Sequence, residues 1–382
     1  MKIAKYFIGI ALLMPLAINA NNLEKANAIS KEIKSQYAPD SRQAIWEVTA
    51  KYDGDAVVLK GQTSEADAHA SFVDALNKNK INYKDSIMVY PADKWGIVRI
   101  SVAHLRGKPA HSAEIVSQAI MGTPLRLLEK VGEWWRVQSP DGYISYIVGN
   151  SFVQKSAEEI KTWKQADRLV VSSLDQIKVY SSVDKKGFKD IVSDMVNGCI
   201  VVCEQKQGAM VQVVLPDGRK AWGDASSFVE IGKWADQEFD SEKIIETGYS
   251  MMGIPYLWGG MSTKSLDCSG FARVCYFSNG YILMRDASQQ ALTGVRIEAS
   301  EWEKCQKGDL LFFGNAKTRR VTHVAIYEHD GWYLHSSGRV KRNSVDPNSE
   351  GYLTTPFLHA VRIAGNEGSK GITKVINHPW YF

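Results

Sequence analysis

A cysteine at the start of a predicted helix is the residue of this chain best suited to nucleophilic chemistry. Cys268 follows Asp267 and precedes Ser269, and an apolar run of helical character continues to Phe277. The backbone N–H groups and the dipole at a helix N-terminus favour a thiolate, so we expect this position to lower the pKa of the Cys268 thiol. Cys268 is therefore the candidate nucleophile.

Two histidines downstream are candidates for the base that such a thiol needs within hydrogen-bond reach. His323 lies in a segment of strand-like alternation, and His335 follows after an Asp330-Gly331 pair that is typical of a hairpin turn. A two-stranded hairpin can place both imidazoles on one face. His335 would then orient His323 and hold its tautomer.

The residues alone leave other interpretations open. A single cysteine near a helix start is often a packed small residue, and a histidine on a strand is often a satisfied polar group. Cys268, His323 and His335 are also residue types that bind zinc.

The composition is that of a folded, soluble chain. Its 382 residues carry a formal net charge of +4, with 45% hydrophobic and 23% charged residues. These values exclude a disordered or collagen-like chain and a membrane protein with many spans. The nearly balanced charge argues against a dedicated nucleic-acid binder. The length predicts roughly two to four domains.

Residues 1–20 have the pattern of a secretory signal peptide. Lys2 and Lys5 precede an apolar run from Tyr6 to Ile18, and Ala20 is a suitable cleavage residue. An N-terminal membrane anchor is the alternative, but the run is shorter than the ~20 residues that span a bilayer. We expect a protein exported to the periplasm or the extracellular space, with no stable membrane insertion once the signal is removed.

The five cysteines do not form an even disulfide framework. An odd number in an exported protein leaves at least one thiol free or paired with another chain, and a free thiol is a candidate nucleophile. Cys199 and Cys203 are either small buried residues or a local disulfide, because a zinc site would need two more ligands.

Residues 21–95 predict a small α+β domain without recognisable chemistry, suited to packing or to an adaptor role. Asp53-Gly54 is a hairpin turn signal between two strand-like segments. The expected elements are a helix over 23–37, strands over 44–51 and 56–62, and a helix over 64–79.

Residues 97–232 contain an internal repeat with an offset of 76 residues. Short strands broken by glycine and Pro-Asp-Gly turns predict a small β-barrel in each copy, over 96–156 and 165–232. The matching segments are 116–122 with 192–198, 137–142 with 213–218, and 151–153 with 227–229. A polar linker over 231–242, ending in a helix cap at Asp240 or Ser241, leads to the last domain, 233–382.

Five segments in order within the last domain resemble the NlpC family of papain-like cell-wall cysteine peptidases. They are Tyr256–Gly260, Asp267–Phe271, Gly308–Phe313, His323–Tyr327 and His335. The resemblance implies an antiparallel sheet packed by helices, with the cysteine on a helix and both histidines on strands. The repeat resembles a pair of bacterial SH3-like domains, so the expected fold class is multidomain α+β.

The resemblance also implies residue roles. Cys268 matches the nucleophile of the family, His323 the base and His335 the third, orienting residue. Tyr256 matches a tyrosine that assists the oxyanion site. The reaction of the family requires no metal or other cofactor.

The order of domains is similar to that of γ-D-glutamyl-L-diamino acid endopeptidases. These enzymes cut murein stem peptides between D-Glu and the diamino acid and require a free N-terminal L-Ala. A bound ammonium needs anionic partners. The candidate substrate contacts are Asp267, Ser269, Asp286, Ser288, and Glu114 and Tyr143 of the first repeat.

Simpler roles remain for some of these residues. Asp267 and Ser269 could serve only as helix caps, and Glu114 could be a solvated surface charge. The alternative functions are a wall-binding protein with a silent peptidase fold, a lysin of intact peptidoglycan, and an amidase or acyltransferase.

Overall fold

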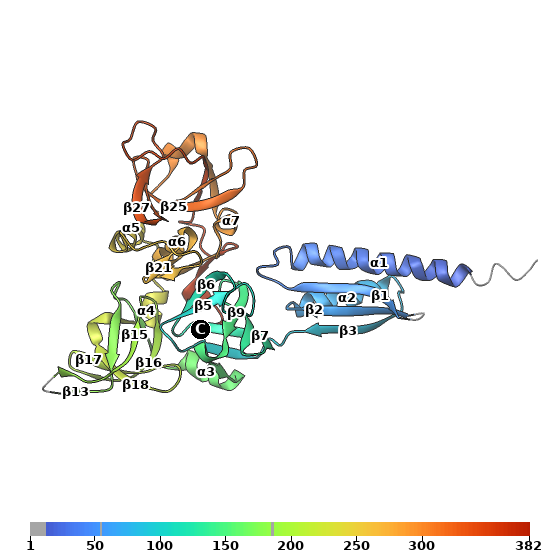
Figure 1. Ribbon diagram of the computed structural model, residues 1–382, viewed down its shortest axis with the longest axis horizontal. Coiled ribbons are helices and arrows are strands. Elements are labelled where there is room, and N and C mark those ends of the chain that lie inside the picture. The colour runs from blue at the N-terminus through green and yellow to red at the C-terminus, as the bar shows by residue number, and fades with distance from the viewer. Residues whose placement is uncertain (1–12, 54–55, 185–186) are drawn as a thin grey trace, which may run out of the picture. The chain divides into compact units, whose positions relative to one another are not determined.

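In the computed structural model the chain forms two compact units, Met1–Ala92 and Asp93–Phe382 (Figure 1). The structure describes residues 13–53, 56–184 and 187–382. Most of the predicted signal segment therefore lies outside the described residues, and its last part, from residue 13, belongs to the first helix. Among the helices of the described residues, we find none with the length and apolar character that a membrane crossing requires.

The first unit is a three-stranded sheet packed by two helices. Strands β1 and β2 are antiparallel, whereas β3 runs parallel to β2. Trp46, Leu59 and Phe72 belong to its core. The elements are α1 (Leu13–Tyr37), β1 (Trp46–Asp53), β2 (Ala56–Thr63), α2 (Ala66–Lys78) and β3 (Tyr83–Val89).

The predicted α+β order of this unit is confirmed, except that sequence reasoning missed β3. Asp53 pairs with Ala56 across the predicted turn, whose Gly54 lies outside the described residues. Strand β3 is largely exposed and shows no regular alternation of buried and exposed residues, so it lacks the pattern by which strands are recognised.

The second unit begins with two seven-stranded sheets of identical topology. They correspond to the two predicted barrels and are called the first and the second barrel below. The first has the order β10-β4-β7-β8-β9-β5-β6, and the second has β19-β11-β16-β17-β18-β12-β15. The first sheet consists of β4 (Trp95–Val98), β5 (Val102–Arg106), β6 (Ile115–Ile120), β7 (Pro124–Val131), β8 (Trp134–Gln138), β9 (Ile144–Val148) and β10 (Phe152–Lys155). The second consists of β11 (Arg168–Val171), β12 (Ile177–Tyr180), β15 (Ile191–Met195), β16 (Ile200–Gln207), β17 (Met210–Val214), β18 (Lys220–Asp224) and β19 (Phe228–Glu230).

The structure confirms the duplication. Each of the strands β6 to β10 begins 76 residues before its counterpart among β15 to β19, as 115 and 191 or 124 and 200 illustrate. The Pro-Asp-Gly turns also correspond: Gly142 donates its N–H to Ser139 at 2.8 Å, and Gly218 donates to Leu215 at 2.9 Å. Both glycines have φ above +80°, a backbone conformation that residues with a Cβ adopt only under strain. The second copy adds a small hairpin, β13 (Val183–Asp184) and β14 (Gly187–Phe188).

Two short helices flank the second copy. Helix α3 (Ala157–Gln165) begins at a capping box made by Ser156 and Glu159. Helix α4 (Ile231–Ala235) corrects the prediction of a polar linker, because Ile231, Trp234 and Ala235 are buried in a core shared with barrel residues. Three apolar residues at i, i+3 and i+4 form one buried face of the helix. The segment as a whole is polar in composition, so this short apolar pattern was not recognised in the sequence.

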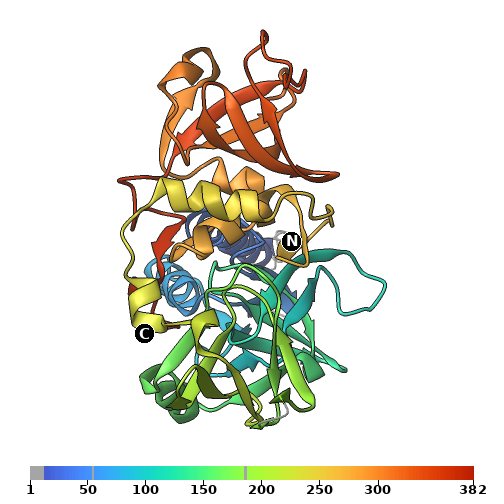
Figure 2. The ribbon, with the colours of Figure 1, turned by 90° about the vertical axis from the view of Figure 1, so that its left-hand side faces the viewer.

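The last part of the second unit is a six-stranded antiparallel sheet with helices packed against it (Figure 2). Its strand order is β23-β28-β24-β25-β26-β27. The strands are β23 (Val295–Glu298), β24 (Leu310–Gly314), β25 (Val321–His329), β26 (Trp332–Ser337), β27 (Arg339–Ser344) and β28 (Phe357–Arg362). The remaining elements are α5 (Ser241–Ser250), α6 (Cys268–Phe277), α7 (Ala287–Gln290) and the strand pairs β20 (Met261–Ser262) with β21 (Ser265–Leu266) and β22 (Tyr281–Leu283) with β29 (Ile372–Lys374).

Helix α6 is central to this domain. Phe271 and Tyr276 are fully buried and pack in one core with Phe312, Val324 and Leu334 of the sheet. This packing fixes the start of α6 beside strand β25. The predicted α+β architecture, with the cysteine on a helix and both histidines on strands, is confirmed.

Candidate active site

Cys268 is the first residue of α6, as predicted. The carboxylate of Asp267 caps the helix by accepting the N–H of Gly270 at 2.6 Å. A side chain at Gly270 would lie 2.0 Å from the carbonyl oxygen of Gly260, so only glycine allows this approach. The same carbonyl accepts the N–H of Asp267 at 3.0 Å. Gly260 and Gly270 thus allow the loop at 256–260 to lie in close contact with the start of α6.

The Cys268 thiol is buried, and its electrostatics differ from the prediction. Burial and the nearby Asp267 carboxylate raise the pKa of Cys268 to about 11. The backbone N–H groups of Val324 and Ser269 act in the opposite direction but are outweighed. The expected lowering of the thiol pKa is therefore wrong for this state of the molecule, because only 8% of Cys268 is exposed and a desolvated thiolate is costly.

The two candidate histidines lie side by side on β25 and β26, which form the predicted hairpin. His323 Nε2 and His335 Nδ1 are 2.7 Å apart, and the rings are nearly perpendicular. His335 Nε2 lies 3.0 Å from Oδ1 of Asn343 on β27. Burial lowers the pKa of His323 to about 4 and that of His335 to about 3. Both imidazoles are therefore neutral at neutral pH.

The structure brings the thiol and the histidine hairpin together. Cys268 packs in one core with Val324, the residue after His323, and the backbone N–H of Val324 lowers the pKa of the thiol. Tyr256 is half-buried near the same thiol, and burial raises the pKa of its hydroxyl well above the usual range. A phenol that keeps its proton can donate a hydrogen bond to an oxyanion.

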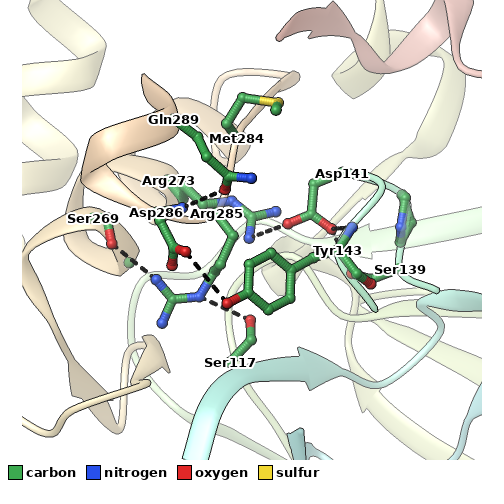
Figure 3. Close-up of polar contacts among 12 residues, drawn as sticks. Ser117, Ser139, Asp141, Tyr143, Ser269, Arg273, Met284, Arg285, Asp286 and Gln289 are labelled. Carbon is green, nitrogen blue, oxygen red and sulfur yellow. Dashed lines mark hydrogen bonds and ion pairs between the residues drawn. The ribbon is translucent and has the colours of Figure 1, made fainter. Parts of the chain in front are cut away.

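Asp267 and Ser269 belong to an internal network with Arg285, whose contact with the Ser269 hydroxyl is drawn in Figure 3. Nη2 of Arg285 lies 2.6 Å from Oδ2 of Asp267, and Nη1 donates to the Ser269 hydroxyl at 2.9 Å. Gly259 also donates its N–H to Oδ2 of Asp267 at 3.0 Å. The oxygens of Asp267 are thus occupied by a guanidinium and backbone N–H groups. Asp267 is therefore a helix cap, which was the simpler of its two interpretations. These contacts do not support the expected role of Asp267 as a partner of the substrate ammonium.

The first barrel is bonded to the cysteine domain through other predicted residues. The indole N–H of Trp258 donates to Oε1 of Glu114 at 2.6 Å. The hydroxyl of Tyr143 donates to Oδ2 of Asp286 at 3.3 Å (Figure 3). The structure thus brings Glu114, Tyr143 and Asp286 to the boundary of the two domains. Ser288 is exposed on α7.

Two buried cations strengthen this boundary. Arg285 donates Nε–H to the hydroxyl of Ser117 on β6 at 2.9 Å. Arg273 of α6 forms an ion pair at 2.7 Å with Asp141 of the Pro-Asp-Gly turn. Only 1% of the Arg285 side chain is exposed. These contacts fix the first barrel against the helix that carries Cys268.

Sequence reasoning missed Arg285, Trp258 and Asn343 as parts of this site. A basic residue directly before Asp286 was a weak signal for Arg285, whereas no sequence pattern identifies Asn343. Within the part of the chain that the structure describes, no three His, Cys, Asp or Glu side chains are arranged to hold a metal ion. Cys199 and Cys203, left open as a disulfide, are free thiols.

Two parts of the chain match known protein families. Residues 253–362 match the NlpC/P60 family, and residues 105–151 match the bacterial dipeptidyl-peptidase SH3 domain. The first match covers the candidate cysteine, both histidines and the loop that contains Tyr256. The second lies in the first barrel and covers Glu114 and Tyr143.

Individual relatives align with about two thirds of this chain. A γ-D-glutamyl-L-lysine dipeptidyl-peptidase of Bacillus cereus is 25% identical, over 69% of this chain and 80% of that protein. Dipeptidyl-peptidase 6 of Lysinibacillus sphaericus is 27% identical, over 65% of this chain and 91% of that protein. The crystal structure of an NlpC/P60 family protein from Bacillus cereus superimposes with a TM-score of 0.60 at 22% identity, over 70% of this chain and 99% of that one. The last likeness supports the fold.

Proposed function

Because this chain carries a cysteine peptidase domain of the NlpC/P60 family behind a bacterial SH3 domain, we propose that it is an exported endopeptidase of murein stem peptides. Its substrate is a peptide with a free N-terminal L-Ala, and the bond cleaved joins γ-D-Glu to the diamino acid. The protein then serves in recycling or turnover of wall peptides. The predicted signal segment supports an envelope location.

The relatives support this substrate class. Two of them, which align with 69% and 65% of this chain, bear the names γ-D-glutamyl-L-lysine dipeptidyl-peptidase and dipeptidyl-peptidase 6. A dipeptidyl-peptidase removes two residues from a free N-terminus. Such an enzyme needs a cleft that is closed after the second substrate residue on the amino-terminal side.

In the proposed mechanism, Cys268 is the nucleophile and His323 the base. The thiol proton passes to Nδ1 of His323 as the sulfur attacks the amide carbon, because the resting thiol and imidazole are both uncharged. The oxyanion accepts hydrogen bonds from backbone N–H groups, including that of Cys268, and from the Tyr256 hydroxyl. The imidazolium protonates the leaving amine, and water then hydrolyses the thioester.

The contacts between the first barrel and the peptidase domain carry the specificity part of the proposal. Glu114 and Asp286 are carboxylates that lie at this boundary and are linked to Trp258 and Tyr143. A barrel fixed here closes one end of the cleft and offers negative charge to an ammonium.

Product analysis by mass spectrometry tests the proposal. The intact protein should release L-Ala-D-Glu from a free tetrapeptide, and the Cys268→Ala variant should not. Purified sacculi, whose stems carry a lactyl amide instead of a free amine, should be poor substrates. Comparable rates on sacculi would favour a wall lysin, and wall binding without cleavage of any stem peptide would favour a silent peptidase fold.

A further inference from the structure

A continuous chain of hydrogen bonds leads from the histidine pair to the backbone of a distant loop. It runs from His323 to His335 at 2.7 Å, from His335 to Asn343 at 3.0 Å, and from Asn343 Nδ2 to the carbonyl oxygen of Gly351 at 3.0 Å. His335 is 2% exposed, so water has little access to the middle of this chain.

The direction of each hydrogen bond follows from its last member. A carbonyl oxygen only accepts, so the amide nitrogen of Asn343 must face Gly351 and Oδ1 must face His335. The reverse orientation of the amide would set two oxygens against each other. Oδ1 in turn requires a proton on Nε2 of His335, which leaves a lone pair on Nδ1 of that neutral ring.

The same logic extends to His323. The lone pair on Nδ1 of His335 accepts a proton held on Nε2 of His323, and the neutral His323 ring then carries its free lone pair on Nδ1. That nitrogen is the one available to a thiol. The protonation of both rings is therefore set by a side chain that touches only the second.

The carbonyl of Gly351 is itself held in place. It also accepts the backbone N–H of Ser344 at 2.8 Å, which ties the loop to the end of β27. A Cβ at Gly351 would lie 2.4 Å from the ring of Trp332. The glycine thus lets the loop approach close enough for its carbonyl to orient Asn343.

We propose that Asn343, oriented by the carbonyl of Gly351, is a positioning residue that fixes the tautomers of His335 and His323. The inference rests on the proposed role of His323 as the base. When Nδ1 of His323 takes the thiol proton, Nε2–H of the resulting imidazolium still donates to Nδ1 of His335, and no other proton has to move. A His335 ring with its proton on Nδ1 would instead direct two N–H groups at each other.

The charged groups near the pair do not replace this function. Lys341 is the cross-strand partner of His335 and lowers the pKa of both imidazoles, and Asp267 raises that of His323. Neither side chain hydrogen-bonds to either ring among the contacts of the described residues. A positive charge at Lys341 favours neutral rings, but it does not decide which nitrogen of each ring carries the proton.

Nitrogen-15 NMR of the histidine side chains tests the proposal without reference to activity. In the intact protein labelled with ¹⁵N-histidine, both rings should be neutral at pH 7 with the proton on Nε2. Signals are assigned by His323→Gln and His335→Gln variants. Asn343→Leu removes the acceptor and should give His335 a mixture of tautomers. Arg339→Ala, at the exposed end of the same strand, should change nothing.

Kinetics on the free tetrapeptide supply the second measurement. Asn343→Leu should lower kcat by roughly tenfold or more with little change in KM, since it disturbs the base and not substrate binding. Asn343→Asp keeps an acceptor, so it should retain the Nε2 tautomer and most of kcat, while its charge moves the acid limb of the pH profile upward. An unchanged tautomer and kcat in Asn343→Leu would overturn the proposal. An inactive wild type with the expected tautomers would overturn the proposed function instead.

Discussion

Arg285 and Asp267 form a buried ion pair, with 2.6 Å between Nη2 and Oδ2, at the residue that caps the helix of Cys268. The same guanidinium donates to Ser117 in the first barrel at 2.9 Å. One buried cation therefore joins the first barrel to Asp267, the residue that caps α6 and directly precedes the nucleophile. Docking of the barrel and geometry of the active site depend on each other through this side chain.

Replacing Arg285 should reveal that dependence. Arg285→Met leaves the Asp267 carboxylate buried without its partner, which should cost about 3–5 kcal/mol of unfolding free energy. The hydrolysis rate should fall as well, because the cap of α6 loosens. Denaturant unfolding monitored by tryptophan fluorescence measures the first effect. Arg296→Met, which removes an exposed ion pair on β23, is the matched control and should be nearly neutral.

Cys268 should be required for hydrolysis but not for folding. Cys268→Ala removes the proposed nucleophile and should abolish product formation while leaving the circular dichroism spectrum and the melting temperature nearly unchanged. Cys305→Ala and Cys275→Ala remove buried thiols away from the histidine pair and should retain most activity. Hydrolysis by Cys268→Ala at a rate near wild type would contradict the assignment.

The pH dependence should reflect an uncharged thiol and an uncharged imidazole. Burial lowers the pKa of His323 to about 4, so the base stays unprotonated as pH falls through the usual histidine range. The acid limb of kcat/KM should therefore lie near pH 4 to 5 and not near 6.5. Initial rates on the free tetrapeptide between pH 4 and 9 provide the measurement.

Alkylation gives a control that needs no substrate. Burial raises the pKa of Cys268 to about 11, so the thiolate fraction and the rate of iodoacetamide labelling should rise about tenfold for each pH unit between 6 and 9. Cys268→Ala corrects for the other thiols. A fast labelling rate that does not vary between pH 5 and 8 would instead indicate a thiolate–imidazolium pair.

Stability should follow the same shifts. The lowered pKa values of His323 and His335 mean that the unfolded chain binds protons before the folded protein does. These two groups therefore cost no stability above about pH 6.5, and the loss develops as pH falls from there toward 4. The expected slope is at most about 1.4 kcal/mol per pH unit for each imidazole.

Local patterns predicted the elements that carry the site. The Asp330-Gly331 turn indicated the hairpin of His323 and His335, and the segment after Asp267 indicated the helix of Cys268, because turn and capping preferences act within a few residues. The repeat could be predicted because similar segments recur in the sequence at an offset of 76 residues. The strand boundaries have the same offset.

The energetics of the site could not be predicted from such patterns. The thiol pKa depends on burial by the whole domain, which outweighs the favourable helix start. Arg285 meets Ser117 across 168 residues, and Asn343 of β27 meets His335 of the neighbouring strand β26. These contacts exist only after folding, and without them the sequence indicates a thiolate and an unassisted histidine pair.

His323 and His335 should differ in the effect of their removal. His323→Ala deletes the proposed base and should reduce kcat by several orders of magnitude, whereas His335→Asn can still accept the Nε2–H of His323 and should retain a measurable fraction. Single-turnover kinetics on the free tetrapeptide separate the two variants. Equal and complete losses would show that His335 does more than orient its neighbour.

Glu114 should determine preference for a free N-terminus. Its carboxylate is fixed by the Trp258 indole N–H at 2.6 Å and is otherwise exposed at the boundary of the first barrel. An ammonium bound there gains a partner that an acetylated peptide cannot use. Glu114→Gln keeps the contact with Trp258 but removes the charge.

We expect Glu114→Gln to lower kcat/KM for the free tetrapeptide by roughly tenfold, as the loss of one charge-assisted contact implies. Any residual cleavage of the N-acetylated peptide should be unaffected, so the ratio of the two rates should fall. Glu133→Gln, at an exposed ion pair with His111 in the same barrel, should leave the ratio unchanged. Equal losses on both peptides would mean that Glu114 stabilises the first barrel without binding the substrate ammonium. The first barrel would then form a wall of the cleft without recognising charge.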